Sequence, residues 1–314
     1  MNHHLSLISQ KFVLAAALGG ILTATAAHAT LNVVATTPEL AAIAQAIGGD
    51  RVAVTSLAKP TEDPHFVTPK PSFIVKLNHA DALIEGGAEL EVGWLPPLLD
   101  NARNPKLALG APGRLQAATV VSMLEVPTTL DRSKGDIHAM GNPHFMTDPL
   151  NGRAVAQLIA ERLGTLAPKE AEVFKANLAK FNERLDAKLI EWQKSLAPCA
   201  SKRVVAYHNT WPYFAQRFAL KVDLFLEPKP GIPPTPANLA AVMSRMKAER
   251  IRTVIVEPYQ NRKTAERVAA ETGAVVLDFC QFPGGVKGTE GGYIELLDYL
   301  VQSLAKALAT EGKP

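Results

Sequence analysis

Residues 203–227, RVVAYHNTWPYFAQRFALKVDLFLE, alternate apolar runs with a segment of helical period. This stretch predicts a strand over 203–210, a helix over 211–220 and a second strand over 221–227. A strand, a helix and a strand in that order form the unit of a parallel sheet. The alternation continues to residue 259 with one more helix and one more strand, so we predict an α/β lobe here.

The first part of the chain has the same order of elements. Val33-Val34-Ala35 matches Val204-Val205-Ala206 at the corresponding place in the repeat. We therefore expect a second α/β lobe with a mostly parallel sheet, and we base this on the order of elements more than on the short identity. Its predicted elements are, in turn, strand 31–37, helix 38–47, strand 51–58, helix 71–80 and strand 81–87.

The segment between the lobes, residues 168–196, reads PKEAEVFKANLAKFNERLDAKLIEWQKSL. Its apolar side chains recur at helical spacing with no internal proline or glycine, which predicts one long amphipathic helix. At 1.5 Å per residue this helix is about 43 Å long and reaches both lobes. We expect a lobe over 30–164, a rigid linking helix over 165–198, a second lobe over 199–314, and a small conformational change on ligand binding.

The N-terminal residues 1–29 have the pattern of a secretion signal. The apolar run Phe12–Leu22 has 11 residues, too short to span a bilayer, and Ala27-His28-Ala29 provides the small residues that precede a cleavage site. We expect cleavage before Thr30 and a soluble periplasmic protein. Because the first cysteine is Cys199, we expect no lipid anchor on the mature chain. A buried N-terminal helix is the alternative.

The composition excludes several classes of protein. Hydrophobic residues make up 47% of the chain and charged residues 20%, as in a packed globular protein. The net charge of +3 is not concentrated in any basic run, so nucleic-acid binding is not expected. Cys199 and Cys280 are too few for a disulfide scaffold or a four-thiolate site, and we expect them at opposite ends of parallel strands, too far apart for a disulfide.

Three histidines stand at or near strand ends, two of them directly after a proline. They are His65 in EDPH, His144 in GNPH and His208 in VAYH. The carboxyl ends of parallel strands are where ligands bind, so these imidazoles can meet in the cleft between the lobes. Neutral imidazoles suit zinc. The alternative is that each histidine caps a turn or is a satisfied core group.

A carboxylate is expected as the fourth ligand. Asp278 ends the last predicted strand and is favoured over Glu257, which ends the preceding one. Glu62 and Asp63 are expected to orient the imidazole of His65 rather than to bind metal.

Two other histidines remain in the expected mature chain. His79, near a helix end, is expected to be structural. His138 is expected to be solvated, with a role as a transient metal donor as the alternative.

Several segments resemble the metal-binding solute receptors of ABC uptake systems, in the zinc and manganese branch known as the TroA-like or cluster A-I family. The resemblance covers nearly the whole mature chain and is carried by EDPHFVTPKPSFIVKLNHADALIEGGAELE, GNPHFMTDPLNGRAVAQLIAERL, VVAYHNTWPYFAQRFAL, LEPKPGIPPTPANLA and VIVEPYQNRKTAERVAAETGA. It implies two lobes joined by a backbone helix, an ABC permease as partner, and no catalytic residue.

The resemblance also implies that the metal ligands fall on His65, His144 and His208. Manganese receptors of the family place a carboxylate where His208 stands, so the resemblance favours Zn²⁺ over Mn²⁺ as the transported ligand. The chain departs from the family in LDFCQFPGGVKGTEGGY, which does not match the usual aspartate-bearing segment around Asp278. It also lacks the long histidine-rich loop of some zinc receptors.

We therefore expect a monomeric periplasmic receptor that captures zinc and delivers it to a permease, and not an enzyme. The alternative is a secreted zinc-dependent hydrolase with a three-histidine site, although no HExxH helix is present. A third hypothesis is a receptor for an organic solute, which would stack on Tyr207 and Trp211.

Overall fold

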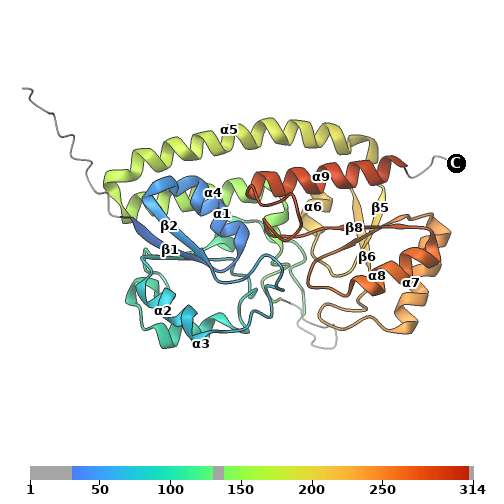
Figure 1. Cartoon of the computed structure of the whole chain (residues 1–314), viewed down its shortest axis with the longest axis horizontal. Helices are drawn as coiled ribbons and strands as arrows, with labels where there is room; N and C mark the ends of the chain where they lie inside the picture. The colour runs from blue at the N-terminus through green and yellow to red at the C-terminus, as the bar shows by residue number, and fades with distance from the viewer. Residues whose placement is uncertain (1–29, 130–137, 311–314) are drawn as a thin grey trace, which may run out of the picture.

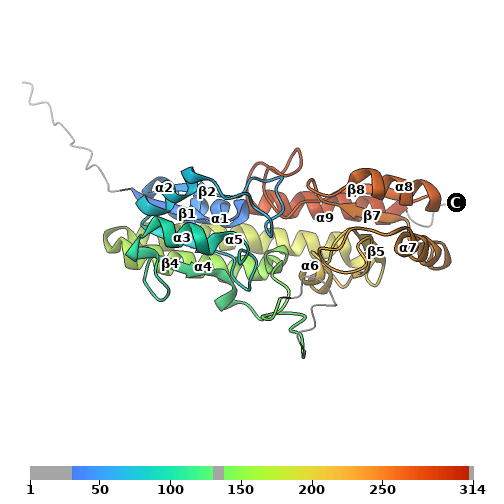
Figure 2. The same ribbon diagram turned by 90° about the horizontal axis from the view of Figure 1, so that it is seen from below.

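The computed structural model describes residues 30–129 and 138–310, and the expected secretion signal over residues 1–29 lies outside them. Figures 1 and 2, which view the molecule from two sides, show two α/β lobes arranged side by side along its long axis. Within the described residues, no helix is both long enough and apolar enough to cross a membrane.

The first lobe is built on a four-stranded parallel sheet with the strand order β2-β1-β3-β4. Proline stands in the first turn of each of its main helices, where its missing N–H is not needed. The elements are β1 (Leu31–Ala35), α1 (Pro38–Gly48), β2 (Val52–Ser56), α2 (Pro71–His79), β3 (Ala82–Glu85), α3 (Leu95–Ala102), β4 (Arg114–Gln116) and α4 (Pro149–Leu166).

The second lobe repeats this topology with the strand order β6-β5-β7-β8, also parallel throughout. The duplication expected from the order of elements is therefore present in the fold. The elements are β5 (Arg203–Ala206), α6 (Pro212–Arg217), β6 (Lys221–Phe225), α7 (Pro236–Glu249), β7 (Thr253–Val256), α8 (Arg262–Thr272), β8 (Val275–Asp278) and α9 (Tyr293–Thr310).

The linking helix α5 (Ala171–Leu196) runs along the side of both lobes, as the upper helix of Figure 1. It packs against α1 and α4 of the first lobe and against α9 of the second. Trp192, fully buried, donates its indole N–H to Asp298 Oδ1 in α9 at 2.8 Å. The predicted long helix is confirmed, and α9 is an additional partner that lies beside it.

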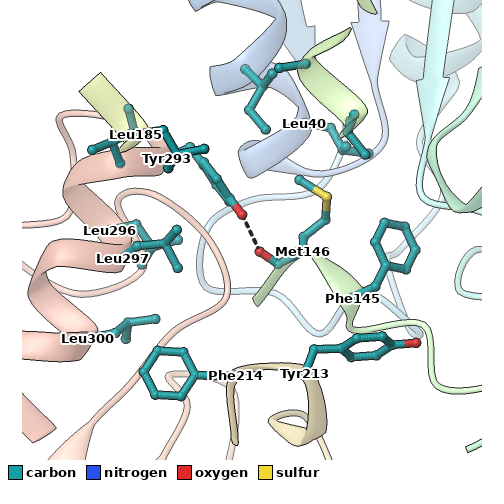
Figure 3. Close-up of a cluster of buried hydrophobic side chains, with 14 of the residues drawn as sticks. Leu40, Phe145, Met146, Leu185, Tyr213, Phe214, Tyr293, Leu296, Leu297 and Leu300 are labelled. Carbon is teal, nitrogen blue, oxygen red and sulfur yellow. Dashed lines mark hydrogen bonds between the residues drawn. The ribbon is translucent and has the colours of Figure 1, made fainter. Parts of the chain in front are cut away.

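One hydrophobic core continues from the first lobe into the second. It includes Phe145, Tyr213 and Tyr293, whose side chains are buried where the lobes meet (Figure 3). Tyr293 Oη donates to the carbonyl of Met146 at 2.7 Å, and Tyr213 Oη donates to the carbonyl of Asn142 at 2.7 Å. Because these two hydroxyls of the second lobe bind the backbone just before α4, they join the two lobes through defined contacts.

Candidate metal centre

Three loops bring three imidazoles together between the lobes. His65 lies in the loop between β2 and α2, His144 precedes the short 3₁₀ turn that leads into α4, and His208 follows β5. Their ring centroids are 5.1 to 5.8 Å apart. One nitrogen of each ring lies within 4.8 Å of the corresponding nitrogens of the other two. The predicted trio therefore converges on one point.

Each of these rings has a hydrogen-bond acceptor behind its Nδ1 atom. The acceptors are Asp63 Oδ1 for His65 (2.9 Å), Gln281 Oε1 for His144 (2.7 Å) and Glu227 Oε2 for His208 (2.7 Å). Because all three atoms are oxygens that accept, the neutral form of each ring carries its proton on Nδ1 and leaves the lone pair on Nε2.

The Nε2 of His65 is buried and has no hydrogen-bond partner among the described residues. A buried nitrogen acceptor without a partner is costly, and a bound cation would satisfy it. The arrangement therefore fits a metal ion held by neutral imidazoles.

The surroundings shift the pKa values of His144 and His208 in opposite directions. Burial, together with the neighbouring His65 and His208, holds the pKa of His144 well below its ordinary value. Burial alone would also lower the pKa of His208, but the hydrogen bond and negative charge of Glu227 leave it raised. Burial would raise the pKa of Asp63, but its hydrogen bonds with the side chain and backbone of His65 leave it lowered, so Asp63 is an ionised acceptor.

His138 lies beside the trio, which corrects the expectation that it is solvated. Its ring centroid is 5.2 Å from that of His65, and it is partly buried. Burial and the neighbouring imidazoles lower its pKa to about 4, so the ring is neutral at pH 7. The backbone N–H of Ala139 donates to Glu89 Oε2 at 2.5 Å, which ties this segment to the first lobe.

Asp278 does not join the histidines, contrary to the expectation. It is the last residue of the edge strand β8, its side chain is 52% exposed, and its carboxylate pairs with Arg262. The chain must continue past the buried Phe279 before it turns into the cleft. A carboxylate at the end of an edge strand therefore faces solvent instead of the site.

Glu257, the alternative, is buried but is not in the ligand group. Its carboxylate accepts hydrogen bonds from Thr210 Oγ1 (2.7 Å) and from Gln281 Nε2 (2.9 Å). Burial raises its pKa to about 7 despite these hydrogen bonds. Glu257 is thus connected to His144 only through Gln281.

Sequence reasoning missed Gln281 and Glu227. Gln281 lies three residues beyond the end of β8, within the segment LDFCQFP that departs from the family pattern. Glu227 lies two residues beyond β6, opposite the loop that carries His208. The signal for both was their position at the carboxyl edge of the sheet, the same argument that selected the histidines.

The other residues singled out from the sequence have ordinary structural roles or lie at the edge of the site. Asp63 orients His65 as expected, whereas Glu62 binds the backbone N–H of Lys59 at 2.9 Å. His79 is exposed at the end of α2. The two cysteines, Cys199 and Cys280, are both buried thiols that no disulfide joins.

The aromatic residues proposed for solute stacking do not form a stacking pair. Trp211 is 1% exposed and packs edge-on against Phe279, with ring centroids 5.1 Å apart. Tyr207, which is 7% exposed, contributes to the wall of a pocket of about 220 Å³ beside His65 and His208. The pocket beside the histidines is therefore small, and Trp211 is not part of its lining.

Comparison with known proteins gives one family and several relatives. The family model described as ZnuA, zinc-uptake complex component A, periplasmic, matches residues 33–307. The iron-binding protein YfeA of Yersinia pestis is 28% identical over 273 residues, which cover 84% of this chain and 82% of YfeA. The manganese ABC transporter substrate-binding lipoprotein PsaA of Streptococcus pneumoniae serotype 4 is 24% identical over 289 residues, covering 89% of each chain.

The fold has a close counterpart among solved structures. The crystal structure of a ZnuA superposes with a TM-score of 0.75 at 25% identity, and the match covers 89% of this chain and 99% of that one. The two-lobed architecture and the long helix are thus shared over the whole length of that protein. The word lipoprotein in the name of PsaA is at variance with the unanchored mature chain expected from the sequence.

Proposed function

Because the chain belongs to the ZnuA family, zinc-uptake complex component A, we propose that it captures a zinc ion between its lobes and delivers it to an ABC permease. As a member of a family of metal ABC transporter substrate-binding proteins it is not an enzyme, so the hydrolase alternative is set aside. The observation that carries the proposal is the convergence of His65, His144 and His208, each with an oxygen acceptor on its Nδ1 atom.

The donor set favours zinc over the metals named for some relatives. PsaA is named for manganese and YfeA for iron. Within the described residues, the ligand group of this chain contains three imidazoles and no carboxylate. Manganese prefers hard oxygen donors, whereas imidazole nitrogen suits zinc. We therefore assign zinc as the ligand and manganese as a weaker competitor.

We assign the fourth position of the zinc ion to His138. Its ring lies as close to His65 as His144 does, with centroids 5.2 and 5.1 Å away. A turn of this ring toward the other three would complete a tetrahedral set of four nitrogens, the geometry that zinc prefers in closed sites. Asp278 is left out of the ligand set because it pairs with Arg262.

The cellular setting follows from the same proposal. A substrate-binding component of an ABC importer works outside the cytoplasm, and we place this one in the periplasm as a monomer. Zinc binding needs no chemical step. The proteins that receive the ion are the membrane subunits of the permease, and the ion itself is the transported substrate.

Metal titration of the stripped protein tests the proposal. We expect one zinc ion per chain, with manganese bound more weakly in a chelator competition assay. His65→Ala should abolish tight binding, whereas His79→Ala, a change at an exposed histidine outside the site, should leave it unchanged. Equal zinc affinity for wild type and His65→Ala would refute the site.

A further inference from the structure

The Nδ1 atoms of the three proposed ligands have two kinds of hydrogen-bond partner. Asp63 and Glu227 place a carboxylate directly on the Nδ1 atoms of His65 and His208. His144 instead meets the side-chain amide of Gln281, at 2.7 Å. Resting on the proposed function, we propose that Gln281 is a positioning residue that connects His144 to the buried carboxylate of Glu257 and thereby holds His144 in its metal-binding tautomer.

The contacts of Gln281 determine which way its amide faces. Its Nε2 atom lies 2.9 Å from Glu257 Oε1 and 2.9 Å from Tyr259 Oη. The Glu257 and Tyr259 oxygens both accept from this atom, so the NH₂ group lies on that side and the carbonyl oxygen faces His144. A carbonyl oxygen can only accept. His144 must therefore carry its proton on Nδ1, which leaves Nε2 available to a metal ion.

Glu257 is itself held in place by the end of the neighbouring strand. It is 2% exposed, and its Oε2 accepts from Thr210 Oγ1 at 2.7 Å and from Gln260 Nε2 at 3.1 Å. Thr210 stands two residues after His208 on the same loop. The chain of hydrogen bonds from His144 thus ends beside the loop that carries a second ligand.

This connection joins two parts of the molecule at the site. His144 belongs to the segment that leads from the first lobe into α4, whereas Gln281 and Glu257 stand at the carboxyl edge of the second sheet. Without the amide, the buried Nδ1 of His144 would lose its acceptor. The ring could then place its proton on Nε2 instead, where a proton and a metal ion compete for the same lone pair.

The experiment compares zinc affinity and imidazole tautomer in four proteins. Gln281→Ala removes the three side-chain hydrogen bonds to His144, Glu257 and Tyr259. Gln281→Met removes them while it keeps most of the volume, in case Gln281→Ala does not fold. The double variant Glu257→Gln with Gln281→Glu restores one donor and one acceptor in reversed order and gives His144 a carboxylate partner. Gln302→Ala, at an exposed glutamine of α9, is the matched control.

We expect Gln281→Ala and Gln281→Met to bind zinc about 10- to 100-fold more weakly, the usual effect of losing a partner behind a ligand. The double variant should recover most of that affinity, and Gln302→Ala should match wild type. ¹⁵N NMR of the metal-free protein should show the His144 proton on Nδ1 in wild type and a mixture of tautomers in Gln281→Met, a change that a purely structural role would not produce.

The inference fails if wild type binds zinc and both Gln281 variants bind it equally well with an unchanged tautomer. It also fails if the double variant is no better than Gln281→Ala. A wild-type protein that does not bind zinc is a different result, because it refutes the proposed function and not only the role of Gln281.

Discussion

Glu227 accepts the Nδ1 proton of His208 at 2.7 Å, and the same carboxylate oxygen also accepts the backbone N–H of Gly231 at 3.3 Å. This pair crosses from the loop after β5 to the end of β6, so the two neighbouring strands determine the orientation of a proposed ligand. A carboxylate behind an imidazole also raises the basicity of the ligating nitrogen.

Replacing Glu227 should therefore weaken zinc binding without abolishing it. We expect Glu227→Ala to lower the affinity about 10- to 100-fold, because the ring loses its acceptor, and Glu227→Gln to lower it less, because the amide oxygen can still accept. Chelator competition measures both changes. Glu271→Gln, at an exposed glutamate on α8, is the control, and a Glu227→Ala protein with wild-type affinity would contradict the prediction.

The buried carboxyl group of Glu39 should make the stability of the folded protein depend on pH. Glu39 is 4% exposed, its Oε1 accepts from Thr37 Oγ1, and its buried Oε2 has no hydrogen-bond partner among the described residues. Burial raises its pKa from 4.5 to about 8. The folded protein then holds a proton that the unfolded chain releases above about pH 4.5. The contribution of the protonated Glu39 side chain to the free energy of unfolding is therefore complete below about pH 4.5 and is lost as the pH rises towards 8.

Glu39→Gln should remove the loss of stability between about pH 4.5 and pH 8. We expect the variant to melt at a higher temperature than wild type at pH 8, because its amide stays neutral and no charge has to be buried. The two proteins should melt at nearly the same temperature at pH 4.5. Glu183→Gln, at an exposed position of α5, should show no such pH-dependent difference. A constant difference at both pH values would show that Glu39 does not titrate as described.

Two glycines of α4 provide a matched test of the packing between the lobes. A Cβ atom at Gly152 would lie 2.4 Å from the ring of Tyr293, whereas at Gly164 its nearest neighbour, Ala171 Cβ, would be 3.4 Å away. We expect Gly152→Ala to destabilise the protein by about 1–3 kcal/mol through overpacking. Gly164→Ala should stabilise it by up to about 1 kcal/mol, because alanine is the better helix former. Urea unfolding measures both, and equal effects would contradict the close packing of Gly152 against Tyr293, whose side chain appears in Figure 3.

The linking helix and the shared core predict that the lobes move little when the ion binds. Besides α5, the interface includes Tyr213 and Tyr293, and Arg217 of α6 makes two hydrogen bonds of 2.8 Å with Asp148, the residue that caps α4. We expect the same radius of gyration for metal-free and zinc-loaded protein in small-angle scattering. A clear contraction on zinc addition would indicate a hinge that these contacts do not permit.

The sequence predicted the elements near the site well because their patterns are local. Buried β1 and β5 are short apolar runs, and α5 shows the helical period over its whole length. The histidines could be selected because strand ends of parallel sheets meet at one edge. The same rule selected Glu257 as an alternative ligand, but in the structure it contacts Gln281 and is outside the ligand group.

The errors concern side chains whose direction depends on tertiary contacts. Asp278 and Gln281 are three residues apart, yet the structure turns one to Arg262 at the surface and the other to His144 in the cleft. No periodicity in the sequence separates these outcomes. His138 likewise belongs to a polar loop, and only its packing against His65 shows that it is close to the site.

X-ray absorption at the zinc edge, on protein loaded with one equivalent of zinc, tests the central claim most directly. The account predicts one tightly bound ion per chain, ligands at about 2.0 Å, and the multiple scattering of at least three imidazoles, which falls by one in each of the variants His65→Ala, His144→Ala and His208→Ala that still retains metal. A spectrum with fewer than three imidazoles in wild type, or a metal-loaded variant whose spectrum is the same as that of wild type, would contradict it.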